Sequence, residues 1–142
     1  MHHIKKEILL LFPRAEFGAP CNEREIAEAG AELGKPLPRE IGLLYSHFNG
    51  IFVPGSSEKL FPLLRKHGNT SLVSITQFLR QEPWARGIDD VVFFGMSRQN
   101  MYWGADNKPS PQVVEFSHEI EAPRVVAKSI MEAYRMDQAW NR

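Results

Sequence analysis

The sequence predicts a single α+β domain, in which an antiparallel sheet is covered by an N-terminal pair of helices and a C-terminal helix. Its 142 residues, 43% of them hydrophobic, suffice for one domain with a substantial core and are too few for two ordinary domains. Residues 22–48 carry helical periodicity. Segments rich in β-branched and aromatic residues, separated by polar turns, then follow between Ile51 and Phe116. Helices segregated from a run of consecutive strands are typical of the α+β class.

The N-terminal helix pair is predicted by boundary signals between Glu32 and Gly50. Gly34 suits the left-handed conformation that closes a helix, and Pro36 prevents that helix from continuing. Pro38 suits the first turn of a second helix, and Asn49-Gly50 is expected to end it. Apolar residues spaced three and four apart give the second helix a single stripe, formed by Ile41, Leu44, Tyr45 and Phe48.

The first helix of the pair is predicted to begin after Asn22. Asn22 and Glu25 form a capping-box pattern, in which each side chain accepts a hydrogen bond from an amide at the start of the helix. Ile26 and Leu33 fall on one face together with Gly30. Glycine inside a helix costs about 1 kcal/mol relative to alanine, so Gly30 indicates close packing over that position, with a chance occurrence as the alternative.

The sheet is expected to be built mainly from segments after the second helix. Ile51–Val53 is predicted to form a strand that enters the core, and Leu60–Leu64 an edge strand, because Pro62 cannot donate a ladder hydrogen bond. Residues 107–111 are expected to form a polar turn between two later strands. Three segments give the pattern of an antiparallel meander: Val91–Gly95, Met101–Gly104 and Gln112–Phe116.

Two further helices are predicted. Ser74 and Gln77 offer a second capping box, which favours a short helix over Ile75–Gln81. Pro123 suits the first turn of a C-terminal helix that packs on the sheet. Its apolar face is formed by Val126, Ile130, Ala133 and Tyr134.

Several of these segments together resemble the SMI1/KNR4 family, also called the SUKH superfamily. The resemblance centres on residues 33–50, where Leu-Gly-Lys-Pro-Leu-Pro separates two helices and Phe-Asn-Gly ends the second. Upstream, Glu25-Ile26 and Ala31-Glu32 are similar to the first helix of the family. Downstream, the segments similar to its strands are Val91–Gly95, Tyr102–Asp106 and Val113–Phe116. The resemblance implies an SMI1/KNR4-like domain over residues 20–142, preceded by an N-terminal extension, residues 1–19, that packs on the domain.

The same resemblance implies a class of activity. Family members are known mainly as bacterial immunity proteins that neutralise polymorphic toxins and, in fungi, as regulators linked to cell-wall synthesis. Neither role requires catalysis. We therefore expect a non-catalytic protein-binding domain, an immunity protein whose partner is a cognate toxin such as a nuclease. A regulatory scaffold linked to cell-wall synthesis is the first alternative, and a small hydrolase or metal-dependent enzyme is the second.

Composition excludes several classes of partner. Seventeen basic and seventeen acidic residues cancel, so the chain lacks the positive field that draws proteins to nucleic acid. Cys21 is the single cysteine, which excludes an intramolecular disulfide and a thiolate zinc site and favours the cytoplasm. The N-terminal apolar run, Ile8–Phe12, is too short for a membrane span or a secretory signal. We expect neither direct nucleic-acid binding nor membrane binding.

Candidate catalytic groups fall in none of the spacings that catalytic or metal sites require. His118 and the acids that follow it at the end of a predicted strand are the best local cluster for a metal, although a solvated loop explains them equally well. An enzyme would have to use the region of His118 and Asp106, or pair Cys21 with a distant histidine. We therefore expect no catalytic residue, no cofactor and no metal.

A protein-binding surface is the remaining candidate site. It is expected to combine aromatic and acidic side chains, namely Trp84, Asp89, Asp90, Trp103 and Asp106. The acids would attract a basic partner such as a nuclease toxin, and Trp84 or Trp103 would then be buried as an anchor. Alternation along a strand places Tyr102 and Trp103 on opposite faces, so one of this pair is expected in the core.

Overall fold

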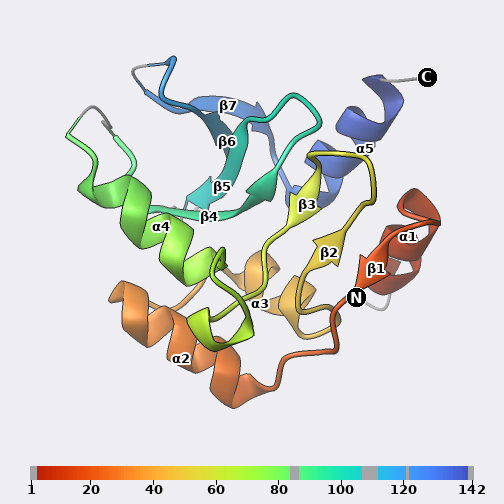
Figure 1. Ribbon diagram of the computed structural model, residues 1–142, viewed down its shortest axis with the longest axis horizontal. Coiled ribbons are helices and arrows are strands. Elements are labelled where there is room, and N and C mark those ends of the chain that lie inside the picture. The colour runs from red at the N-terminus through yellow and green to blue at the C-terminus, as the bar shows by residue number, and fades with distance from the viewer. Residues whose placement is uncertain (1–2, 84–86, 107–111, 121, 141–142) are drawn as a thin grey trace.

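The described residues form one antiparallel sheet whose strands pair in chain order, and helices lie on both of its faces (Figure 1). The structure, a computed structural model, describes residues 3–83, 87–106, 112–120 and 122–140. Its strands are β1 (Glu16–Phe17), β2 (Ile51–Phe52), β3 (Lys59–Leu60), β4 (Val91–Met96), β5 (Tyr102–Asp106), β6 (Val113–Phe116) and β7 (Arg124–Ala127). Its α-helices are α1 (His3–Leu11), α2 (Glu23–Leu33), α3 (Arg39–Tyr45), α4 (Leu72–Gln81) and α5 (Ile130–Trp140). The predicted single α+β domain with an antiparallel sheet is confirmed.

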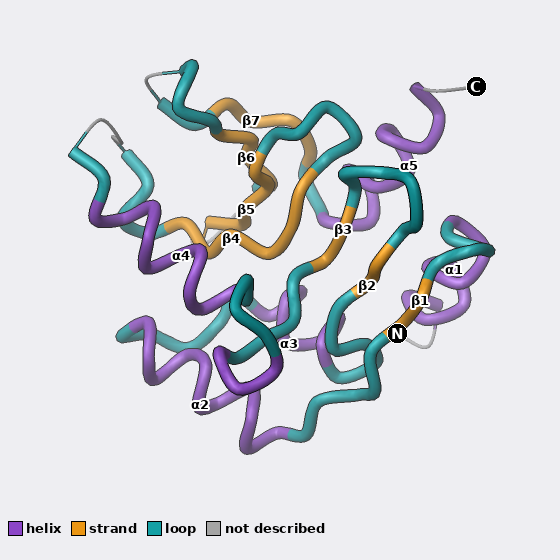
Figure 2. Tube along the Cα trace, viewed as in Figure 1, coloured by secondary structure: helices purple, strands orange, loops and turns teal. Residues whose placement is uncertain are grey.

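Alternation along the strands gives the sheet an inner and an outer face. The inner face packs on α1, α3 and α5 in one hydrophobic cluster, which includes Phe94, Trp103 and Tyr134. The outer face packs on α4 in a smaller cluster, which includes Leu79 and Phe93. Figure 2 shows α4 in front of the strands and α5 on their other side. The sheet is therefore the middle layer between one helix and a group of helices.

The start and end of α2 follow the sequence signals closely. Asn22 Oδ1 accepts a hydrogen bond from Glu25 N at 2.8 Å, and Glu25 Oε1 accepts one from Asn22 N at 3.0 Å. Gly34 closes the helix in the left-handed region, with φ of 87°. A Cβ added at Gly30 would lie 2.9 Å from Lys35 O, so the segment after the helix passes directly over this glycine. Both the predicted caps and the predicted close packing are confirmed.

Helix α3 buries the predicted stripe but ends earlier than expected. Its last residue is Tyr45, whose hydroxyl donates to Phe61 O at 2.5 Å and ties the helix to the chain after β3. Phe48 lies beyond the helix, and its ring packs 4.9 Å from that of Phe17. Backbone N–H groups of residues 47 and 48 both donate to Leu44 O, which turns the chain toward β2 before Asn49 is reached.

The segment predicted as an edge strand at 60–64 is instead an internal strand. β3 contains only Lys59 and Leu60, and it pairs with both β2 and β4. Pro62 lies past its end, where its carbonyl accepts a hydrogen bond from Leu72 N at 2.7 Å. The prediction of an edge strand was wrong because the missing N–H of proline falls outside the ladder.

Two helix starts also differ from the predictions. Helix α4 begins at Leu72 rather than Ile75, because the hydroxyl of Ser71 caps it by accepting from Ser74 N at 3.0 Å. Residues after Pro123 form β7 instead of the start of a helix, and α5 begins at Ile130. Apolar residues at this spacing suit a strand as well as a helix, and pairing with β6 decides in favour of the strand.

The N-terminal residues contribute to both the sheet and the inner layer. β1 pairs with β2, which places Glu16 opposite Phe52. Helix α1 packs beside α5, where the ring of Phe12 meets that of Tyr134 edge-on at 5.2 Å. The same two helices are joined by an ion pair of 3.2 Å between Glu7 and Arg135. No helix within the described ranges is long and apolar enough to cross a bilayer.

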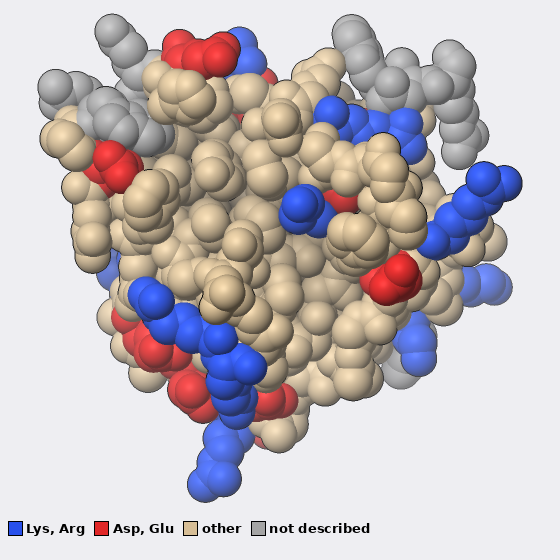
Figure 3. Space-filling view, viewed as in Figure 1, with Lys and Arg blue, Asp and Glu red and all other residues tan. Residues whose placement is uncertain are grey.

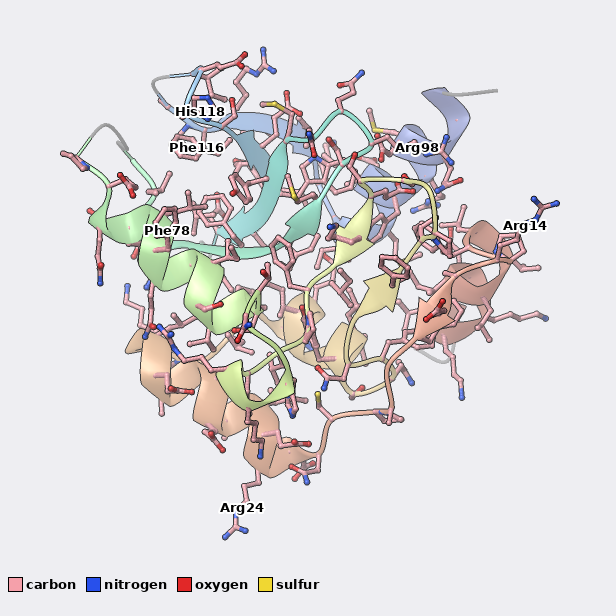
Figure 4. The ribbon with its side chains drawn as sticks, in the orientation of Figure 1. Arg14, Arg24, Phe78, Arg98, Phe116 and His118 are labelled. Atoms are coloured by element: carbon pink, nitrogen blue, oxygen red, sulfur yellow. The ribbon has the colours of Figure 1, made fainter. Side chains whose placement is uncertain are left out.

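A buried polar cluster joins the end of α5 to the β2–β3 and β4–β5 connections. Glu58 is fully buried, and its Oε1 accepts from Gln138 Nε2 at 2.5 Å and lies 3.5 Å from Arg98 Nε. Arg98 N donates to Asp137 Oδ2 at 3.0 Å, and the Arg98 side chain lies beside the end of α5 (Figure 4). Burial, reinforced by the nearby Asp137 carboxylate, raises the pKa of Glu58 to about 8. This carboxyl group therefore keeps its proton in neutral solution.

Candidate functional site: an acidic hollow on the outer face

Helix α4 covers only the middle of the outer face. Its Leu79 and Ile75 pack on Phe93 and Phe116. Thr76 holds the helix in place, because its hydroxyl accepts from Phe93 N at 2.9 Å next to a bulge in β4. The outer face therefore stays open on both sides of α4, over β1–β3 and at the far ends of β4–β7.

The second of these openings is the acidic hollow, of about 280 Å³. Its walls include the side chains of Asp89, Asp90, Asp106, Gln112, Val114 and Val125. Asp89 and Asp90 lie exposed in the turn before β4. Asp106 ends β5 and pairs in register with Val91 at the start of β4. The structure thus brings together the three acids that the sequence analysis selected.

Neighbouring groups and burial limit how much of the negative charge of these three aspartates reaches solvent. Lys35 Nζ lies 2.9 Å from Asp90 Oδ1, and both side chains are more than half exposed. Asp106 is nearly fully buried, and its Oδ1 accepts from Gln112 N at 3.2 Å. Arg80 lies behind Asp89 and Asp90 and donates to Val91 O at 3.1 Å. Burial lowers the pKa of Arg80, an effect that the two aspartates oppose. Asp89 and Asp90 therefore supply the exposed charge, and Lys35 offsets part of it.

Neither predicted tryptophan anchor lies in the described part of this hollow. Trp103 is on the inner face, 4% exposed, and its ring lies 5.5 Å from that of Tyr134. The prediction of Trp103 as an exposed anchor is therefore corrected: it is a core residue. Tyr102, its neighbour, is half-buried on the outer face and contacts Phe93 at 6.3 Å between ring centroids, as alternation predicts. Trp84 lies outside the described residues.

The groups weighed as catalytic are placed in unfavourable surroundings for nucleophilic chemistry. Burial, followed by the charge of Glu25, raises the pKa of the Cys21 thiol to about 11, so the thiol stays protonated in neutral solution. His67, which contacts Glu25 of the same helix start, uses both ring nitrogens: Nδ1 accepts from Leu64 N at 3.1 Å, and Nε2 faces Glu25 at 3.1 Å.

His118 and Asp106 belong to different parts of the outer face. His118 lies beside Phe78 of α4 and Phe116 (Figure 4), in a hollow that it shares with Tyr102. Asp106 lies in the acidic hollow. Within the residues that the structure describes, no group of three or more histidine, cysteine or acidic side chains could hold a metal ion.

Sequence reasoning identified the acids but not the shape that gathers them. Val125 lines the hollow without any signal in the sequence, because β7 was not recognised, and Gln112 was predicted only as the start of a strand. The sequence did contain a signal for the face of the sheet on which Asp106 lies. Asp106 lies three residues after Trp103 in a strand, so assigning Trp103 to the core would have placed Asp106 on the opposite face.

The fold and the site together define a small α+β domain whose open outer face carries acidic and apolar side chains. The sequence profile of the SMI1 / KNR4 family (SUKH-1) matches residues 20–135. The chain belongs to this family. No curated protein matches the sequence. The resemblance predicted from residues 33–50 and from the strand segments is therefore confirmed.

Proposed function

We propose that this chain is a non-catalytic binding protein of the immunity type, which protects a cell by occluding a cognate toxin in the cytoplasm. Family membership supports the class of activity. The observation that carries the proposal is the convergence of Asp89, Asp90 and Asp106 on one hollow of the outer face. Regulation of cell-wall synthesis would use the same binding physics with a different partner, and no contact among the described residues favours it over the toxin.

The acidic hollow suits a nuclease toxin in particular. Such a toxin binds a polyanion and so presents a basic cleft. The net charge of the chain is zero, and attraction must therefore come from a local patch. Asp89 and Asp90 are the exposed members of that patch, and Val125, 57% exposed, offers apolar area beside them. A basic loop that enters the hollow would displace Lys35 from Asp90 and replace its charge.

The test is charge reversal at the hollow. We expect Asp89→Lys combined with Asp90→Lys to slow association with the toxin by about tenfold and to flatten its salt dependence, because rim charges act mainly on the association rate. The matched control is Glu28→Lys combined with Glu32→Lys, which reverses two exposed charges on α2. Stopped-flow mixing with the cognate toxin measures both variants, and circular dichroism checks their folding.

The same pair of variants is then tested for protection. Cells that express the toxin should grow with the wild-type chain and with the α2 control, and should grow poorly with the hollow variant. Full protection and unchanged association by the hollow variant would place the interface elsewhere on the domain. Turnover of any toxin substrate by the chain alone would refute the non-catalytic mechanism.

A further inference from the structure

The other opening of the outer face lies over β1, β2 and β3, on the opposite side of α4 from the acidic hollow. It is a hollow of about 460 Å³, and its walls include Glu16, Phe52, Lys59 and Pro62. Figure 1 shows these three strands uncovered beside α4. In Figure 3 the middle of this face is covered mostly by uncharged atoms, and charged side chains gather at its margin. We call it the β1–β3 hollow.

Strand register arranges three of its side chains in a row. Glu16 of β1 pairs with Phe52 of β2, and Phe52 pairs with Lys59 of β3. Directly paired residues point to the same face, so an acid, an aromatic ring and a base follow one another across the strands. Neighbouring strands are about 4.8 Å apart, which separates the Cα atoms of Glu16 and Lys59 by roughly 10 Å.

All three members of the row are available to a partner. Phe52 is 52% exposed, the largest exposure of any aromatic ring on these three strands. Glu16 is exposed and Lys59 half-exposed. Among the described residues, neither of these two charges takes part in an ion pair. The chain thus leaves one negative and one positive charge unpaired on either side of an exposed ring.

This row is complementary to itself. A two-fold axis that runs parallel to β2 over Phe52 reverses the order of the row on a facing copy. Glu16 then meets the partner's Lys59, Lys59 meets the partner's Glu16, and the two Phe52 rings stack at the centre. Such a contact is isologous, since each copy uses the same patch. The zero net charge adds no long-range repulsion between the two copies.

We propose that a second copy of this chain occupies the β1–β3 hollow, so that the protein forms a symmetric homodimer through Glu16, Phe52 and Lys59. A foreign partner would need its own matching acid, apolar group and base, whereas a second copy supplies them by symmetry. Because α4 separates the two openings, the dimer leaves both acidic hollows free. Each dimer therefore offers two equivalent sites for a basic partner.

The experiment uses charge swaps and sedimentation velocity over a range of protein concentrations. We expect the wild-type chain to dimerise with a dissociation constant in the micromolar range. Glu16→Lys alone and Lys59→Glu alone each place like charges face to face, and each should weaken the dimer by about tenfold or more. The double variant restores opposite charges across the axis and should return to within about threefold of wild type. Glu28→Lys on α2 is the control and should leave the dimer unchanged.

A mixture of the two single variants gives a sharper test. In a heterodimer of the two single variants, the Glu16→Lys site of one copy faces the Lys59→Glu site of the other. The unchanged Lys59 of the first copy faces the unchanged Glu16 of the second, so both contacts join opposite charges. Native mass spectrometry of an equimolar mixture should therefore show heterodimers in excess of either homodimer. Thermal unfolding of each single variant identifies any that fails to fold, and Phe52→Ser then serves as an independent variant that should also yield monomers.

Two results would overturn the proposal. One is a wild-type chain that stays monomeric at about 1 mM, and the other is a dimer that neither single variant weakens. If the chain is monomeric and Phe52→Ser instead abolishes binding of the toxin, the hollow belongs to that foreign protein. Because the Asp89 and Asp90 variants act at the other opening, failure of the dimer leaves the proposed toxin site to be judged separately.

Discussion

Neighbouring residues of the same strands form the two faces of the sheet, but helices cover the two faces to different extents. The inner face is closed by α1, α3 and α5, and its ring residues Phe94 and Trp103 are almost fully buried, as is Tyr134 of α5. The outer face is closed only where α4 crosses it. Both candidate interfaces are the parts of the outer face that α4 leaves open. In this fold, the number of helices that cover a face decides how much of that face stays open to a partner.

The comparison is sharpest at two adjacent rings of β4. Phe93 faces α4 and Phe94 faces the inner helices, and both are fully buried. Truncation of either to alanine should cost about 3–5 kcal/mol, because each leaves a large cavity. We expect different consequences. Phe94→Ala should lower protection from hydrogen exchange throughout the sheet, whereas Phe93→Ala should lower it first in α4.

Urea unfolding measures the loss of stability, and hydrogen exchange followed by mass spectrometry measures its location. If α4 exchanges at the global rate in both variants, the two faces do not differ in local stability, and the comparison fails at the level of energetics.

The second prediction concerns Glu58 of the buried polar cluster. Its pKa is raised to about 8 in the folded chain, from 4.5 in the unfolded chain. As pH rises, the unfolded chain therefore loses this proton at a lower pH than the folded chain does. The contribution of Glu58 to stability is fully present below pH 4.5 and is lost as pH rises to about 8. At about 1.4 kcal/mol for each pH unit, the loss between pH 5 and pH 7 is about 3 kcal/mol.

Glu58→Gln removes this titration while leaving Asp137, Arg98 and Tyr134, the other ionisable groups around it, in place. The difference between the urea midpoints of wild type and variant should therefore change with pH over that window. A constant difference from pH 5 to pH 8 would show that the carboxyl group is already ionised in the folded chain.

The third prediction compares two side-chain hydrogen bonds, one on each face of the sheet, that tie a helix to the main chain. Thr76 of α4 accepts from Phe93 N, and Tyr45 of α3 donates to Phe61 O. Thr76→Val leaves a buried N–H without its acceptor, and we expect a loss of about 1–3 kcal/mol. Tyr45→Phe leaves a carbonyl without this donor, and its cost should be lower, about 1–2 kcal/mol.

Thr76→Ser is the matched control, since it keeps the hydroxyl group. Calorimetric unfolding of the three variants ranks them by their loss of stability. Should Thr76→Val be as stable as Thr76→Ser, the bond to Phe93 N would contribute nothing measurable, and packing together with the Arg80 hydrogen bond to Val91 O would hold α4 on the outer face.

The smallest expected effect on stability lies at the rim of the outer face. Lys35 and Asp90 form an exposed ion pair, and such pairs contribute less than about 1 kcal/mol. Lys35→Ala should therefore leave the unfolding midpoint nearly unchanged. It should speed association with a basic partner, because it uncovers the charge of Asp90. Slower association in this variant would contradict the proposed role of the acidic hollow.

Local signals determined much of the fold from the sequence alone. The cap at Asn22 and the glycine at 34 bounded α2 correctly, because capping hydrogen bonds and positive φ depend on a few adjacent residues. The meander of β4, β5 and β6 was likewise predicted, since each strand has its own β-branched and aromatic residues and a short connection. The charges at Asp89, Asp90 and Asp106 were also recognised in advance.

Tertiary structure decided what depends on partners that are distant in the sequence. The internal place of β3 requires pairing with both β2 and β4, and β7 is a strand because β6 offers it a ladder. Trp103 became a core residue once α5 covered its face, although the sequence shows only an aromatic side chain in a strand. The two hollows have the same origin. They exist because a single helix, α4, crosses a sheet wider than itself, and no local pattern records that width.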